Sequence, residues 1–131
     1  RNVELIYQQP KTPTPMLNID SNKIGEAIAN LIDNAIQYTL KGKIKIIAKI
    51  ENKNFIFTIK DTGIGIEKQD MSKLFKKIAR LPRAINISPD GTGLGLFIVK
   101  SMVEKHGGGV EAQSEGDDKG SEFRFWIPVK Q

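Results

Sequence analysis

Apolar residues recur at helical spacing in two stretches of the chain. From residue 24 to residue 36 they fall three or four apart, which predicts one buried helix face; they are Ile24, Ala27, Ile28, Leu31, Ile32, Ala35 and Ile36. Asp20 and Ser21 are N-cap candidates, because their side-chain oxygens can accept hydrogen bonds from free backbone N–H groups. A second helix is predicted over GLGLFIVKSMVEKH, with an apolar face made of Leu94, Phe97, Ile98, Met102 and Val103.

Alternating apolar and polar residues predict the strands. In KGKIKIIAKI, the isoleucines at 44, 46 and 50 and Ala48 face one way while Lys43, Lys45 and Lys49 face the other, as in a strand with one wet face. FIFTIK follows the polar turn ENKN with Phe55, Phe57 and Ile59 inward, so residues 43–60 read as a hairpin. VELIYQQ predicts another strand, and GVEAQS and SEFRFWIPV predict a second hairpin.

The segments between these elements are short or irregular. A short helix is predicted over residues 68–77. RLPRAINISPDGT contains two prolines and a glycine without a sustained period, which predicts a long loop at residues 79–93 that could act as a lid. The order strand, helix, hairpin, short helix, loop, helix, hairpin predicts an α+β fold. We expect a two-layer α/β sandwich with a mixed, mostly antiparallel sheet and helices on one face.

Composition limits the class of protein. A chain of 131 residues is expected to form one domain over residues 1–131. No stretch approaches the roughly 18 apolar residues that a membrane span needs. The chain has no cysteine, which excludes disulfides and fits a cytoplasmic location. Because it starts at Arg1 without a signal-like segment, we expect it to be a fragment of a longer protein. That longer protein could be anchored in a membrane by another segment.

Positive charge gathers in the middle of the chain. The net charge is +5, and residues 67–83 hold Lys68, Lys73, Lys76, Lys77, Arg80 and Arg83 against Glu67 and Asp70. This segment would attract a polyanion or a multiply phosphorylated small molecule. A nucleic-acid module would place aromatic side chains among these lysines, and Phe75 is the single aromatic residue there. We therefore expect no nucleic-acid partner.

The stretch NLIDNAIQYT carries polar residues beside an apolar helix face. Helical residues four apart lie about 40° around and about 6 Å along the axis from one another. Asn30, Asn34, Gln37 and Tyr38 therefore form a polar strip along the margin of the apolar face. The amides could satisfy backbone groups in the core, or they could form the wall of a site that offers amide oxygens to a hard cation.

Two glycine-containing motifs follow. In DTGIGI, Asp61 ends a strand and Gly63 and Gly65 leave room for close approach of a flat ligand, although a plain turn capped by Asp61 would look the same. In GTGLGL, the glycines 91, 93 and 95 let backbone amides converge at a helix N-terminus, which favours phosphate. The preceding strand of a dinucleotide fingerprint and the Gly-Lys-Ser/Thr of a P-loop are both missing.

The three motifs together, in this order, resemble the asparagine box and the two glycine boxes of the catalytic and ATP-binding domain of sensor histidine kinases. KLF at 73–75 resembles the phenylalanine box, and KGSEF at 119–123 resembles the last glycine motif. The resemblance covers nearly the whole chain. It implies the Bergerat-type ATP-binding fold shared with gyrase-type topoisomerases, a heat-shock chaperone and mismatch-repair ATPases. It also implies ATP and Mg²⁺ as cofactors.

The resemblance assigns roles to individual residues. Asn34 would give its amide oxygen to Mg²⁺, Asn30 would lie beside the phosphates, and Asp61 would accept the adenine amino hydrogen, with Ser121 nearby through water. The other implied nucleotide-binding residues are Gln37, Tyr38, Gly63, Gly65, Phe75, Lys77, Gly91, Thr92, Gly93, Leu94 and Gly95. Arg80 is implied as catalytic together with Asn30 and Asn34, because the family usually has a lysine or arginine at the position of Gln37, and Arg80, Lys77 or Arg83 could supply that charge.

Departures from the family pattern bear on activity. Ile78 and Lys76 replace the usual aromatic and acidic residues of the phenylalanine box, which affects lid packing and rate more than nucleotide binding. Hydrolases of the superfamily are understood to use a glutamate base where this chain has Asn30, and an amide cannot take up that proton. Glu26 lies roughly 12 Å along the helix axis from Asn34, which is too far for it to act as the glutamate base of the hydrolases. We therefore expect phosphoryl transfer rather than hydrolysis.

The nucleophile is expected on another domain. His106 is the single histidine and stands at a helix end before three glycines, which predicts a C-terminal cap. In the resembling family a histidine on an upstream dimerisation and phosphoacceptor hairpin takes the γ-phosphoryl group, and a response regulator receives it in two-component signal transduction. We expect this fragment to be a monomer. A nucleotide-binding regulatory pseudokinase without transfer activity would share every motif and is the alternative.

Overall fold

A five-stranded sheet forms one layer of the protein in the computed structural model, which describes residues 2–8, 21–39, 41–76, 95–116 and 118–128. Its strands are β1 (Asn2–Gln8), β2 (Lys41–Glu51), β3 (Asn54–Asp61), β4 (Gly109–Gln113) and β5 (Ser121–Pro128). They lie in the order β1-β2-β3-β5-β4. β1 runs parallel to β2, and the other neighbouring pairs are antiparallel. The predicted mixed, mostly antiparallel sheet is therefore confirmed, as are both hairpins.

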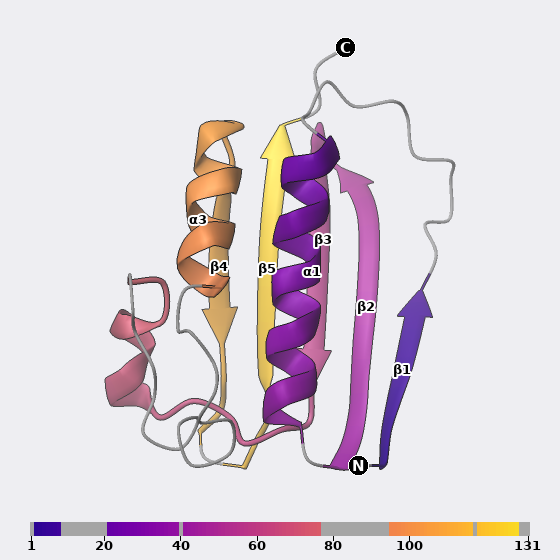
Figure 1. Ribbon diagram of the computed structural model, residues 1–131, viewed down its shortest axis with the longest axis vertical. Helices are drawn as coiled ribbons and strands as arrows, with labels where there is room; N and C mark the ends of the chain where they lie inside the picture. The colour runs from indigo at the N-terminus through magenta and orange to yellow at the C-terminus, as the bar shows by residue number, and fades with distance from the viewer. Residues whose placement is uncertain (1, 9–20, 40, 77–94, 117, 129–131) are drawn as a thin grey trace.

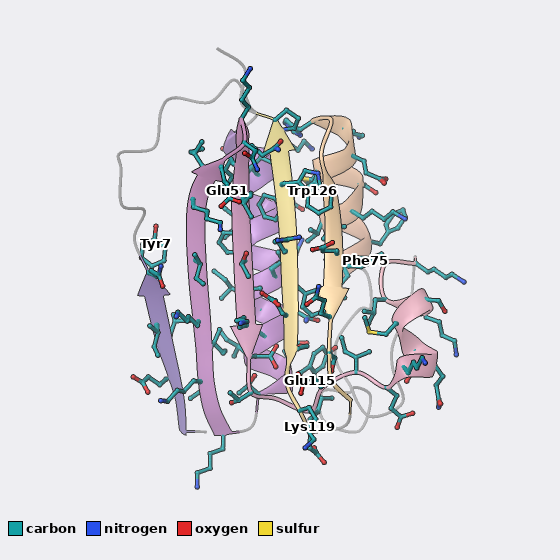
Figure 2. All side chains as sticks on the ribbon, turned by 180° about the vertical axis from the view of Figure 1, so that it is seen from behind. Tyr7, Glu51, Phe75, Glu115, Lys119 and Trp126 are labelled. Atoms are coloured by element: carbon teal, nitrogen blue, oxygen red, sulfur yellow. The ribbon has the colours of Figure 1, made fainter. Side chains whose placement is uncertain are left out.

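Two helices form the second layer. α1 (Ser21–Tyr38) and α3 (Gly95–Lys105) lie side by side on one face of the sheet, as Figure 1 shows. The opposite face carries no described helix and is turned toward the viewer in Figure 2. The predicted two-layer α/β sandwich is confirmed. Among the described residues, no helix is long and apolar enough to span a membrane.

The core lies between the sheet and the two helices. The inward residues of β2 and β3 are those that the alternation predicts, and Ile44, Ile46, Phe57 and Ile59 are buried. Phe125 of β5 is fully buried and stacks on Phe57, with ring centroids 5.4 Å apart. From α1 the core receives Ile24, Ala27, Leu31 and Ala35. Lys43, Lys45 and Lys49 are exposed, so the wet face of β2 is also confirmed.

The predicted apolar faces of both helices need correction. Ile36 is 43% exposed because it lies about 120° around α1 from Ile24, at the margin of the buried helix face. On α3 the buried residues are Val99, Met102 and Val103, whereas Phe97 and Ile98 are only partly buried. Met102 and Val103 are confirmed as buried, whereas Phe97, which lies about 160° around the helix from Val99, was wrongly placed on the buried face.

The short helix at the side of the sandwich is tighter and shorter than predicted (Figure 1). It is the 3-10 helix η1 (Lys68–Lys73) instead of a helix over residues 68–77. The chain then turns so that Leu74 is buried in the core and the Phe75 ring meets Phe123 edge-on, with centroids 6.2 Å apart. The predicted loop at 79–93 and the N-cap candidate Asp20 lie outside the described residues.

Candidate functional site

Asp61 is a buried carboxylate at the end of β3. It is directly opposite Ser121 in the antiparallel register of β3 and β5. The Ser121 hydroxyl donates a hydrogen bond of 2.7 Å to Oδ2, and the Gly63 N–H donates one of 2.9 Å to Oδ1. The carboxylate thus has a fixed orientation. The predicted turn capped by Asp61 is present, and the predicted acceptor at the strand end is present with it.

The electrostatic setting of Asp61 favours a ligand that donates a hydrogen bond. Burial raises the pKa of the Asp61 carboxyl above its ordinary value, and the hydrogen bonds from the Ser121 hydroxyl, the Gly63 N–H and the Ser121 N–H oppose this rise only in part. Ionised Asp61 is therefore short of hydrogen-bond donors. An amino group of a bound ligand would supply one.

The raised pKa of Asp61 predicts how the stability of the fold depends on pH. Between the ordinary pKa of 3.8 and the raised pKa, Asp61 is protonated in the folded protein and ionised in the unfolded chain. Its contribution to the free energy of unfolding therefore falls as the pH rises through this range. Asp61→Asn imitates the protonated carboxyl. We expect the free energy of unfolding of this variant to rise relative to wild type over that window, measured by urea unfolding from about pH 3 to about pH 7. A pH-independent difference would contradict the assignment.

The loop after β3 is fastened to α1 and to the turn after β4. A Cβ atom on Gly63 would lie 2.2 Å from the carbonyl oxygen of Tyr38, and the Ile64 N–H donates to the same oxygen at 3.1 Å. Gly65 has a φ of +72°, and a Cβ atom there would lie 2.0 Å from the carbonyl oxygen of Gly116. Both glycines of DTGIG are thus explained by close backbone packing. Their contact with a ligand remains a prediction.

The polar strip of α1 lies where the sequence predicts it. Asn30, Asn34, Gln37 and Tyr38 are all partly buried, as expected at the margin of the core-facing side. Asn30 approaches the start of α3, where a Cβ atom on Gly95 would lie 3.7 Å from its Oδ1. The α1 strip, the first turn of α3 and the loop after β3 therefore belong to the same end of the helical layer (Figure 1).

Asn30 carries a buried hydrogen-bond donor next to the start of α3. Its amide nitrogen is buried and has no hydrogen-bond partner within the described part of the chain. A buried donor without an acceptor costs about 1–3 kcal/mol, so such groups in native proteins commonly serve a ligand, an ion or water. Beside the start of α3, this nitrogen suits a phosphate oxygen. That NLIDNAIQYT forms the wall of a site stays a prediction.

Other predicted residues have packing roles or lie outside the description. Phe75 packs on Phe123, and contact of its ring with a nucleotide stays a prediction. The His106 ring donates from Nδ1 to the carbonyl oxygen of Met102 at 2.8 Å, so the predicted helix cap is confirmed. The residues outside the described ranges are Lys77, Ile78, Arg80, Arg83, Gly91, Thr92, Gly93 and Leu94.

The structure also corrects or extends the predicted site. The Ser121 hydroxyl donates directly to Asp61, and its expected contact with the nucleotide through water stays a prediction. Thr39, which received no role from the sequence, is fully buried and its hydroxyl has no partner among the described residues. The described residues include no group of three acidic, histidine or cysteine side chains able to hold a metal.

Known proteins share both the sequence and the fold of this chain. Residues 19–131 match the family described as histidine kinase-, DNA gyrase B-, and HSP90-like ATPase. Sensor histidine kinase WalK of Bacillus subtilis is 37% identical over 135 aligned residues, which cover 100% of this chain but only 22% of that protein. A solved mycobacterial sensor histidine kinase, MprB, superposes with a TM-score of 0.84 at 28% identity, covering 98% of this chain and 84% of that chain. Full-length ShkA in complex with AMPPNP gives a TM-score of 0.81 at 25% identity, covering 98% of this chain and 26% of that chain.

Proposed function

Because this chain belongs to the family of histidine kinase-, DNA gyrase B- and HSP90-like ATPases, we propose that it binds Mg-ATP and transfers the γ-phosphoryl group to a histidine on a separate phosphoacceptor domain. Its curated relative WalK is a sensor histidine kinase. The chain spans 22% of the length of that relative, so the acceptor and the signal-sensing parts belong to other segments or other chains.

The observation that carries the proposal is the pairing of a buried acceptor with a buried donor. Asp61, fixed by Ser121 and Gly63, offers a carboxylate to the adenine amino group. Asn30 would offer to a phosphate oxygen an amide N–H that has no partner among the residues the structure describes. A nucleotide has a hydrogen-bond donor at its base and acceptors at its phosphates, so its two ends match these two groups. The structural relative ShkA was solved with an ATP analogue, AMPPNP, which supports the same ligand class.

Asn34 is the proposed protein ligand of Mg²⁺. It stands one helical turn after Asn30 on the same margin of α1, and its amide oxygen is a neutral, hard donor. One protein oxygen is sufficient, because Mg²⁺ retains waters and binds substrate phosphate. The ion would neutralise charge on the transferring phosphoryl group. Gln37 and Tyr38, on the same strip, would complete the wall beside the nucleotide.

The remaining phosphate contacts are proposed for the basic and glycine-rich segment. Lys77 and Arg80 would supply positive charge to the γ-phosphate, with Arg80 acting on the developing charge during transfer. The GTGLGL residues Gly91, Thr92, Gly93, Leu94 and Gly95 would close over the phosphates with backbone N–H groups. Gly63, Gly65 and Phe75 would border the adenine.

Transfer is favoured over hydrolysis by the residues at the phosphate end. Asn30 occupies the position of the hydrolytic glutamate, and its amide cannot act as a base for water. His106 is bonded to Met102 at the far end of α3, so it is poorly placed as the phosphoacceptor. The chain's own contribution would be to hold the nucleotide and align its γ-phosphoryl group for a histidine supplied from outside.

The experiment that tests this function joins the domain to a phosphoacceptor hairpin from WalK and supplies ATP labelled at the γ-phosphate with Mg²⁺. The expected product is acid-labile phosphohistidine on the hairpin, absent when the acceptor histidine is replaced and absent without Mg²⁺. Nucleotide binding without any labelled hairpin, with the intact WalK protein labelled in parallel, would support the regulatory pseudokinase instead. Transfer onward to a response regulator and the monomeric state of this fragment stay predictions.

A further inference from the structure

Several lysines gather at one end of the helix-free face of the sheet. Side chains alternate along strands, so Lys43 and Lys45 of β2 and Lys60 of β3 point away from the helices, and all three are exposed. Lys119 belongs to the turn before β5. Figure 2, which views this face, shows Lys119 and Glu115 at the end of the sheet where β3 ends and β5 begins.

These lysines line an open hollow with a volume of about 560 Å³. Its other wall is formed by Gln113, Ser114, Glu115 and Glu122 from β4, β5 and the turn between them. The volume lies in the range of roughly 300–1,000 Å³ that is usual for small-molecule sites. Four lysines and three acidic residues, Asp61, Glu115 and Glu122, line the hollow, and the exposed lysines make it positive on the side of β2 and β3.

Like charges that face each other in this hollow cost the fold stability. Lys45 and Lys60 are direct partners in the antiparallel register of β2 and β3, and like charges in that position destabilise a sheet, whereas on its other side Lys60 is opposite Glu122 of β5. The ion pairs elsewhere on this face join Lys49 to Glu51 and Arg124 to Glu111. Among the residues that the structure describes, no ion pair joins a carboxylate to any of the four lysines of the hollow. An anion from outside would remove this cost.

We propose that the hollow lined by Lys43, Lys45 and Lys60 is a second binding site, one that takes a phosphorylated small molecule. Lysine ammonium groups bind phosphate as point charges from several directions. The opposite wall presents the acceptors of Gln113 and Glu122, which suit hydroxyl groups of the ligand. A ligand charged at one end and rich in hydroxyls at the other, such as a sugar phosphate, fits this polarity. A long polyanion would place charge against the glutamates.

This site is distinct from the proposed nucleotide site. The Asp61 carboxylate bonds to Ser121 on the side of the sheet that the helices cover, whereas the lysines stand on the other side. Both sites use the ends of β3 and β5, because Asp61, Gly120 and Ser121 also border the hollow. The two ligands can therefore be bound at once, back to back across the sheet.

The test is an amide NMR titration of the domain with inorganic phosphate, glucose 6-phosphate and glucose at constant ionic strength. An ATP analogue with Mg²⁺ is present in excess to keep phosphate out of the proposed nucleotide site. We expect saturable changes in the amide chemical shifts of Lys45, Lys60 and Glu122 with both phosphates and none with glucose. The fitted affinity should be higher for glucose 6-phosphate than for inorganic phosphate. The double variant Lys45→Gln with Lys60→Gln should bind at least about tenfold more weakly. The control Lys49→Gln, on the same strand and face but outside the hollow, should bind like wild type.

Three outcomes would overturn the proposal. They are shifts that do not saturate, shifts that the double variant retains, and shifts confined to Asn30, Asn34 and Gly95 on the opposite side. The readout also separates this proposal from the function proposed above. Saturable shifts in the hollow of a domain that fails to bind the ATP analogue would support the second site and contradict the nucleotide site.

Discussion

Asp61→Asn weakens binding of the ATP analogue by about 100-fold, or roughly 3 kcal/mol, if Asp61 holds the adenine as proposed. The Ser121 hydroxyl and the Gly63 N–H already donate to the carboxylate oxygens. An asparagine offers one oxygen in place of two and directs an N–H group at one of these donors or at the adenine amino group. Isothermal titration calorimetry with the Mg²⁺-bound analogue measures the loss.

The matched control is Asp33→Asn, which makes the same chemical change at an exposed position of α1. It should bind the analogue like wild type. The urea unfolding midpoints of both variants establish that each is folded at the pH of the titration. Full affinity in a folded Asp61→Asn variant would show that the base lies elsewhere.

Asn34→Ala should slow phosphoryl transfer to the hairpin by about 100- to 1,000-fold. The alanine removes the proposed protein oxygen on Mg²⁺, so the ion loses its fixed place beside the phosphates. Binding of the analogue in EDTA should change little, while the gain in affinity on adding Mg²⁺ should disappear. Initial transfer rates and paired calorimetric titrations with and without Mg²⁺ measure these two effects.

Asp33→Ala serves as the control for Asn34→Ala, because it truncates the neighbouring exposed side chain of the same helix. It should keep both the transfer rate and the Mg²⁺ dependence. If Asn34→Ala kept its Mg²⁺ dependence, the ion would have to be held by other groups, and the proposed role of Asn34 would be wrong.

The elements that the sequence predicts well are those in which polar and apolar residues differ sharply. The lysines of β2 mark its wet face, and the polar strip of α1 marks the margin of its buried face. The face of α3 could not be found this way, because residues 96–99 are all apolar and no period distinguishes them. The packing of Val99 and Val103 on the sheet decides which side is buried. The 3-10 geometry of η1 likewise depends on tertiary contacts, since so short a helix has little stability of its own.

The candidate site was predicted in its parts but not in its connections. Asp61 and Ser121 are 60 residues apart, and their hydrogen bond follows from the register of β3 with β5, which no local pattern specifies. The packing needs of Gly63 and Gly65 are similarly visible only when the loop meets the end of α1 and the turn after β4. The unpartnered amide of Asn30 depends on how closely α3 approaches α1.

The central claim is that Asp61 recognises the adenine amino group of ATP, and a two-by-two calorimetric cycle tests it most directly. Wild type and Asp61→Asn are each titrated with the Mg²⁺-bound ATP analogue and with the matching inosine analogue, in which oxygen replaces the amino group. We predict that wild type prefers the adenine analogue by at least about tenfold and that the variant loses this preference. Equal preference in both proteins would contradict the claim, because the discrimination would then come from groups other than Asp61.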